Sequence, residues 1–134
     1  MRGRNQLGMV VALCGALAGI EGAVLAAQEK PLVTGQPKVE VLVTTQLSEV
    51  GLSGTNVAQR VTIPPGTQMA DHTHSGRTSL LIMVQGALTE VRGSAKHEYK
   101  TGDVIQVSEG TTHHAENHGT IPAVYIEINT TAKK

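Results

Sequence analysis

The sequence predicts an all-β protein built as a sandwich or a barrel. Short runs of alternating apolar and polar residues recur along the chain, and turn-forming residues separate them. Residues 39–129 contain 11 Val, 6 Ile and 6 Leu, and β-branched side chains favour strands over helices. No window carries the 3.6-residue apolar repeat of an amphipathic helix. A sandwich or barrel would bury one face of each strand and limit open edges.

Eight strands are expected along the chain. The first spans residues 39–44, where every second residue is a valine, and the second spans residues 57–63 and stops before a Pro-Pro-Gly turn. Five more end at turns that contain glycine, and the last closes the domain. These six span residues 79–84, 87–91, 96–99, 104–107, 112–117 and 123–129.

The N-terminus has the three parts of a secretory signal peptide. Arg2 and Arg4 precede 14 uncharged residues, and small residues follow as far as Ala26 and Ala27. The apolar run is too short to span a bilayer comfortably, so an uncleaved anchor is the less favoured alternative. We expect residues 1–26 to be a signal peptide, residues 27–38 a linker and residues 39–131 the folded domain. The mature protein would then be periplasmic or secreted, with no stable membrane anchor.

Composition argues against several classes of protein. Lys+Arg and Asp+Glu both total 11, so the chain lacks the basic excess of a nucleic-acid binder. Tyr99 and Tyr125 are the only aromatic residues of the Phe, Trp and Tyr types, which leaves no stacking platform for single strands. Cys14 is the only cysteine, so neither a disulfide nor a cysteine-based metal site is expected.

Histidines form the most informative pattern. His72 and His74 make an H-x-H pair, and residues i and i+2 of a strand point to the same face, roughly 7 Å apart. His113 lies on a separate expected strand. Three imidazoles from neighbouring strands could hold one metal ion and leave other coordination positions open.

The spacing around the first two histidines is similar to the first motif of the cupin family, G-x5-H-x-H-x3,4-E-x6-G. The corresponding residues are Gly66, His72, His74, Ser79 and Gly86. All of them match the motif except Ser79, which stands where the family has a glutamate.

The second cupin motif, G-x5-P-x-G-x2-H-x3-N, has a counterpart in Gly102, Ser108, Gly110, His113 and Asn117. Here Ser108 replaces the proline of the family. Eight of the ten motif positions match in order and spacing. The resemblance implies a small antiparallel jelly-roll barrel in which His72, His74 and His113 are metal ligands.

Ser79 leaves three alternatives, because a hydroxyl is a poor substitute for the carboxylate ligand of the family. The metal is held by three neutral histidines, or another side chain fills the gap, or the site has decayed. Gln68 has the strand parity of the H-x-H pair and is the best local candidate, whereas Asp71 and Glu116 have the wrong parity. We favour three neutral histidines, which leave the metal its full charge and favour an anionic ligand.

Other residues are expected near the site. Met83 shares the parity of Ser79, so it either lines the cavity or packs in the core. Asn117 shares the parity of His113 and is expected to face inward in a hydrogen-bonding role. Arg77 lies close to the H-x-H pair, where it either meets an anionic ligand or stays on the surface. His114 has the opposite strand parity to His113 and should point outward.

The expected cofactor is one divalent transition metal, either Zn, Cu, Fe, Mn or Ni, because histidine ligands suit these ions. The first functional hypothesis is an exported metalloenzyme of dioxygenase-like type that acts on a small polar or anionic substrate. The alternative is a non-catalytic cupin module that binds a small ligand or a metal. Small cupins commonly pair through edge strands, so residues 39–43 are expected to join a homodimer.

Overall fold

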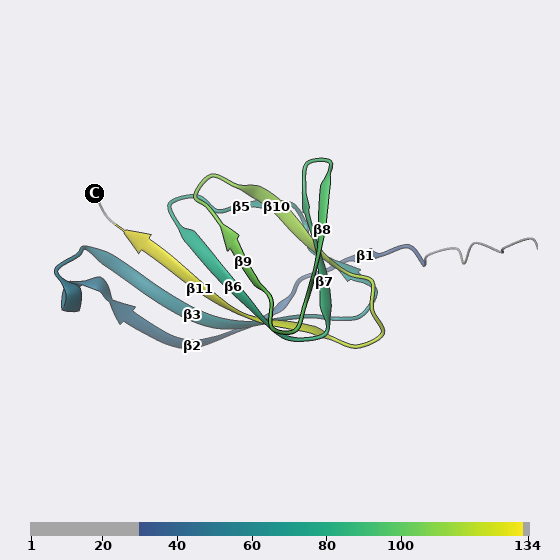
Figure 1. Ribbon diagram of the computed structural model, residues 1–134, viewed down its shortest axis with the longest axis horizontal. Helices are drawn as coiled ribbons and strands as arrows, with labels where there is room; N and C mark the ends of the chain where they lie inside the picture. The colour runs from purple at the N-terminus through teal and green to yellow at the C-terminus, as the bar shows by residue number, and fades with distance from the viewer. Residues whose placement is uncertain (1–29, 133–134) are drawn as a thin grey trace, which may run out of the picture.

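Strands form nearly all of the regular structure (Figure 1). The structure is a computed structural model that describes residues 30–132, so the predicted signal peptide lies outside the described residues. In this part of the chain, no helix has the length and apolar character needed to cross a membrane. The elements are, in chain order, β1 (Val33–Thr34), β2 (Lys38–Gln46), the 3-10 helix η1 (Leu47–Val50), β3 (Gly54–Ile63), β4 (Thr67–Gln68), β5 (His72–Thr73), β6 (Thr78–Gln85), β7 (Ala87–Arg92), β8 (Ala95–Lys100), β9 (Val104–Val107), β10 (Thr112–Asn117) and β11 (Ala123–Ala132).

All eight expected strands are present, and most run one to three residues longer than expected at an end. Three further strands, β1, β4 and β5, have two residues each and are too short to show an alternating pattern. β1 lies within the expected linker and pairs in parallel with β4, so that Val33 lies opposite Thr67. This part of the linker is therefore attached to the folded domain.

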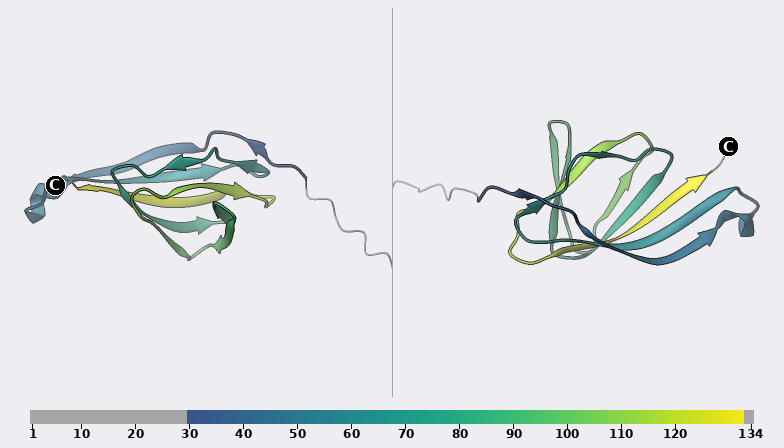
Figure 2. Two further views of the ribbon diagram at one scale, coloured as in Figure 1. Left: turned by 90° about the horizontal axis from the view of Figure 1, so that it is seen from above. Right: turned by 180° about the vertical axis from the view of Figure 1, so that it is seen from behind.

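The strands form two sheets whose apolar faces meet. One sheet has the order β1-β4-β10-β7-β8, with β5 also paired to β10, and the other has the order β2-β3-β11-β6-β9. Apart from β1 with β4, every pair is antiparallel. In both views of Figure 2 the β2–β3 hairpin, with η1 at its tip, extends away from the β7–β8 hairpin. The architecture confirms the expected antiparallel jelly-roll barrel.

Alternation along the strands divides the side chains between core and surface. On β6, Leu81 and Met83 are buried, whereas Leu80 and Ile82 are exposed. The core lies between the sheets, because Leu88 of the first sheet clusters with Leu81 and Met83 of the second. Of the two roles open to Met83, the structure shows the core role. The side chain of Met83 packs between the sheets, and this residue is not among those that line the cavity beside the histidines.

Gly86, at the end of the first motif, has a physical reason to be glycine. It has φ +74° in the β6–β7 turn, a conformation that other residues rarely adopt. A Cβ at this position would lie 2.7 Å from the backbone oxygen of Pro122. The turn and the segment that leads into β11 can therefore pack closely only when this residue has no side chain.

Candidate metal centre

Three histidine side chains meet where β5 pairs with β10. His72 on β5 lies directly opposite His113 on β10 in the strand register. The ring centroids of these two histidines are 4.6 Å apart, and that of His74 lies 4.8 Å from His113 and 5.3 Å from His72. One ligand nitrogen from each ring lies within 4.8 Å of the others. The expected metal-binding histidines are thus brought together.

Backbone hydrogen bonds fix the segment that carries the pair. The amide of His74 donates to the carbonyl of Thr111 at 3.0 Å, and the amide of Gly110 donates to the carbonyl of His74 at 3.0 Å. These bonds continue the pairing of β5 with β10 by one more residue. Consequently the rings of His72 and His74 lie on the same side of this segment, with centroids 5.3 Å apart.

Each of the three rings donates a hydrogen bond from Nδ1. The acceptors are the carbonyl of Ala70 for His72, at 3.2 Å, and the Glu90 carboxylate for His113, at 2.7 Å. His74 Nδ1 lies 2.8 Å from Ser79 Oγ, and the Ser79 hydroxyl donates its own proton to Asn129 Oδ1. Ser79 Oγ is therefore the acceptor, and the proton of His74 is on Nδ1. In a neutral ring, a proton on Nδ1 leaves Nε2 unprotonated and able to bind a metal.

The Nε2 atoms of two of the rings face each other closely. Nε2 of His74 lies 2.9 Å from Nε2 of His113, and both side chains are buried. Two ring nitrogens at this distance either share a proton in a hydrogen bond or bind the same cation. The donor set therefore fits a divalent transition metal, which binds neutral imidazole through this kind of nitrogen.

The surroundings of His72 and His74 favour the neutral form of both rings. Burial lowers the pKa of His72 below its ordinary value. Burial, together with the nearby charge of Arg77, lowers the pKa of His74 to about 4. Both rings are therefore neutral at pH 7, which is the protonation state that metal binding requires.

Ser79 occupies the position of the family glutamate but contacts a histidine. Its side chain is fully buried, and its hydroxyl accepts from His74 and donates to Asn129 on the neighbouring strand β11. The residue thus orients the ring of His74. This geometry supports the alternative in which three neutral histidines supply the ligands.

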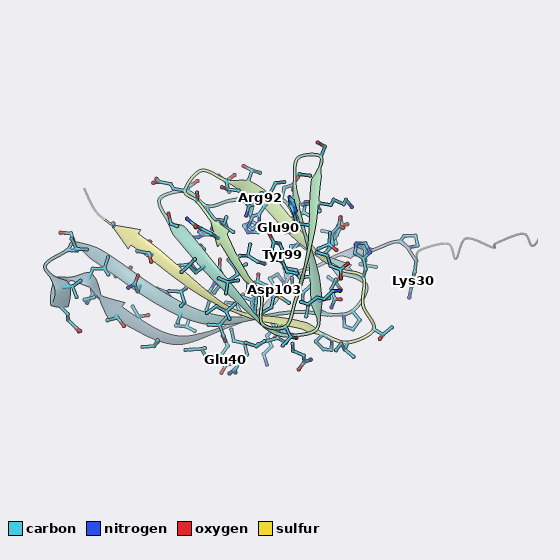
Figure 3. All side chains as sticks on the ribbon, viewed as in Figure 1. Lys30, Glu40, Glu90, Arg92, Tyr99 and Asp103 are labelled. Carbon is cyan, nitrogen blue, oxygen red and sulfur yellow. The ribbon has the colours of Figure 1, made fainter. Side chains whose placement is uncertain are left out.

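Glu90 has the corresponding role behind His113. It lies on β7 beside Arg92 (Figure 3), and Arg92 Nη2 is 2.9 Å from the same oxygen that accepts from His113. Burial raises the pKa of Glu90, but the hydrogen bonds from His113 and Arg92 outweigh burial and lower the pKa below its ordinary value. An ionised carboxylate on Nδ1 fixes the tautomer of a ligand histidine and increases its basicity.

A cavity of about 150 Å³ lies beside the histidines. His72 and His113 line it on one side, and aliphatic side chains such as Leu81 and Ile105 form much of the wall. Its polar lining includes Gln59, Arg77, Glu90 and Glu127. A ligand in this space would contact the histidine cluster and both apolar and charged groups.

Gln68, the candidate for the alternative in which another side chain fills the gap, contacts β1 instead of the histidines. Its Nε2 donates to Thr34 Oγ1 of β1 in an exposed contact at 3.3 Å. Residues 69–71 do not continue a strand, so the alternation from Gln68 to His72 is lost. Met69, the next residue along the chain, lines the cavity instead.

Asn117 faces inward as expected, and its role is structural. Its Nδ2 donates to the carbonyls of Ile63 and Ile121, and its Oδ1 accepts from the amide of Gly119. The side chain is buried and ties the end of β10 to the end of β3 and to the turn before β11. Its partners are thus backbone groups of turns and strand ends.

The outward face of β10 carries a separate charged cluster. His114 lies between Asp71 and Glu116, and Glu116 also contacts Lys96 and His118. Burial raises the pKa of Glu116, but hydrogen bonds from His118, Lys96 and His114 outweigh it and lower this pKa to about 2. His114 and Glu116 therefore lie on the opposite face of β10 from His113, as their parity predicted, and Asp71 contacts His114 there.

Sequence reasoning missed two buried carboxylates of the cavity. Glu90 shares the strand parity of the buried Leu88, and Glu127 shares that of the buried Tyr125. Each could have been found by testing every charged residue against the alternation of its own strand. Neither residue occupies a position of the two cupin motifs.

Comparison with known proteins gives one consistent result. A family model described as a cupin domain matches residues 59–129. The structure is similar to the cupin domain of Cnp3 from Schizosaccharomyces pombe, with a TM-score of 0.62 and 16% identity, over 72% of this chain and 66% of that chain.

Two further structures are similar. A conserved protein from Klebsiella pneumoniae with a double-stranded β-helix domain has a TM-score of 0.61 and 20% identity, over 75% of this chain and 87% of that chain. KdgF from Halomonas sp. has a TM-score of 0.59 and 18% identity, over 72% of this chain and 82% of that chain. At these identities the likeness shows the fold. No curated protein sequence matches the chain.

Proposed function

The chain belongs to the cupin domain family, and from this premise we propose that it is an exported metalloprotein that acts on a small polar or anionic molecule by oxygen-dependent oxidation. The observation that carries the proposal is the arrangement of the three histidines. Each ring has its Nδ1 proton held by an acceptor, and the three rings converge. A set of histidines that were only packed together would not need this shared orientation.

The ligand residues would be His72, His74 and His113. A bound transition metal would supply a Lewis acid and, if it is iron, copper, manganese or nickel, a redox centre. The residues of the chain do the remaining work. Ser79 and Glu90 hold two of the rings in the binding tautomer, and the aliphatic wall limits the entry of water.

Charge supports an anionic or polar ligand. Three neutral histidines leave the full charge on a divalent ion, whereas a glutamate at the position of Ser79 would neutralise part of it. The resemblance to cupin dioxygenases that use three histidines supports oxygen-dependent oxidation. The near absence of aromatic side chains makes a bulky flat substrate a poor fit.

Export and pairing are parts of the same proposal. The N-terminal pattern supports export, and a metal acquired after export would favour Zn²⁺ or Cu²⁺ by intrinsic affinity. A homodimer is supported by β2, which is at the edge of its sheet and has exposed side chains at Val39, Val41 and Val43.

Metal content tests the proposal. We would purify the full chain without a histidine tag and measure metals by elemental mass spectrometry, beside His72→Ala and the control His97→Ala. His97 is exposed on β8, so its loss should leave the metal content unchanged. We expect about one equivalent in the wild type and the control, and almost none in His72→Ala. Equal metal content in all three proteins would refute the three-histidine site.

Oxygen uptake distinguishes the two functional hypotheses. A metal-loaded protein that consumes oxygen with a small hydroxylated or carboxylated compound would support the enzyme. A protein that binds metal and small ligands tightly but consumes no oxygen with any of them would favour the non-catalytic binding module.

A further inference from the structure

Glu127 is a buried carboxylate in the wall of the cavity. It lies on β11, opposite Gln59 of β3 and Leu81 of β6, and is 7% exposed. Gln59 Nε2 donates to Glu127 Oε2 at 2.5 Å, and both residues line the cavity. The neutral amide thus fixes the carboxylate at one oxygen.

A buried carboxylate held in this way favours a ligand that can donate a hydrogen bond. Among residues 30–132, the hydrogen bond to Glu127 comes from an amide, and no lysine or arginine forms an ion pair with it. A carboxylate removed from water without a counter-charge is costly unless donors surround it. A second negative group placed beside it would be repelled.

Arg77 is a positively charged residue that lines the same cavity. Its Nε is buried and has no hydrogen-bond partner among the described residues. A guanidinium group pairs well with a carboxylate, and among the described residues no Asp or Glu forms an ion pair with Arg77. The metal, held by neutral histidines, would also attract an anionic oxygen.

The volume limits the size of the ligand. The cavity measures about 150 Å³, and an apolar cavity of about this size holds a molecule as large as benzene. The aliphatic side chains of Leu81, Leu88 and Ile105 would contact the carbon skeleton. The space therefore suits a compact molecule with polar groups at two ends.

We propose that the cavity binds a small aliphatic monocarboxylate that carries a hydroxyl group, with the carboxylate towards Arg77 and the metal and the hydroxyl donating to Glu127. This inference rests on the proposed metal site and names the class of its ligand. A dicarboxylate is excluded by Glu127.

Three probes that share one skeleton test the inference. Hydroxypivalate, pivalate and dimethylmalonate differ only at one end, where they carry a hydroxymethyl, a methyl and a carboxylate group. Binding to the zinc-loaded full chain would be measured by calorimetry at pH 7. We expect hydroxypivalate to bind about tenfold more tightly than either of the others, the effect of one hydrogen bond to a charged group.

The variant Glu127→Gln keeps the shape of the side chain and removes its charge. We expect it to bind dimethylmalonate about tenfold more tightly than the wild type does, and to lose most of the preference for hydroxypivalate. Glu98→Gln, at an exposed carboxylate that pairs with Lys100, is the matched control and should keep the wild-type ratios. Circular dichroism would show that both variants fold.

The zinc content of each sample distinguishes a failure of the metal site from a failure of the proposed ligand class. Full zinc content with the same three affinities in the wild type and Glu127→Gln would overturn the inference and leave the metal site standing. Equal binding of pivalate and hydroxypivalate to the zinc-loaded wild type would overturn it as well. Failure of the wild type to bind zinc would overturn both the metal site and the inference.

Discussion

Replacing Ser79 with alanine tests whether this residue orients a metal ligand. The substitution removes a hydroxyl that accepts from His74 Nδ1 at 2.8 Å and donates to Asn129 Oδ1 at 2.5 Å. It leaves the backbone and the three histidines in place. The expected result is a folded protein that binds metal more weakly than the wild type.

The size of the effect follows from burial. Ser79 and His74 are both 0% exposed, so the Nδ1 proton would have neither an acceptor nor water. An unsatisfied buried donor costs about 1–3 kcal/mol. Loss of a hydrogen bond behind a metal ligand typically weakens metal binding by about 10–100-fold. We therefore expect the dissociation constant for Zn²⁺ to rise by at least about tenfold.

Competition with a chelating indicator would measure the zinc affinity of the full chain and its variants. Ser75→Ala, at an exposed serine in the turn before β6, is the control and should bind like the wild type. Urea denaturation of the metal-free proteins would report the accompanying loss of stability. A dissociation constant for Ser79→Ala within about twofold of the wild type would refute the orienting role.

Three further changes have definite expected outcomes. Glu90→Gln keeps an acceptor for His113 but removes the negative charge, so zinc affinity should fall by about tenfold in the same competition assay; an unchanged affinity would contradict this role. The lowered pKa of Glu116 stabilises the fold above its ordinary value of 4.5, and this contribution is lost as the pH falls towards 2. Glu116→Gln should therefore cost about 1–3 kcal/mol in urea denaturation at pH 6 and progressively less at lower pH, whereas a constant difference would contradict the assignment. Asn117→Ala leaves two backbone carbonyls without their side-chain donor and should lower the free energy of unfolding by about 2–4 kcal/mol; a loss below about 0.5 kcal/mol would show that water replaces the amide.

Strand alternation explains why most of the fold could be predicted. The valines of β2 and the buried Leu81 and Met83 of β6 repeat every second residue, so their strands are visible in the sequence. β5 has only two residues and was not among the eight expected strands, although the H-x-H pair that begins on it stood out in the sequence. β1 could not be predicted, because its two residues depend on a parallel partner far along the chain.

Within the site, the sequence identified the three histidines but not the groups behind them. The H-x-H pair and His113 occupy motif positions, whereas the hydrogen bond from His74 to Ser79 depends on where the loop returns to β6. The parity argument failed for Gln68, because an irregular segment separates it from His72. Glu127 faces the cavity because of the register in which β11 pairs with β3 and β6. That register depends on the whole sheet.

The tautomers of the histidine rings provide the most direct test of the metal centre. Long-range proton–nitrogen correlation spectra of the labelled full chain, recorded with zinc, distinguish protonated from metal-bound ring nitrogens. Spectra of His72→Ala, His74→Ala and His113→Ala would assign the signals among the six histidines. We predict three rings with a proton on Nδ1 and zinc on Nε2. Binding through Nδ1, or six rings that do not respond to zinc, would contradict the account.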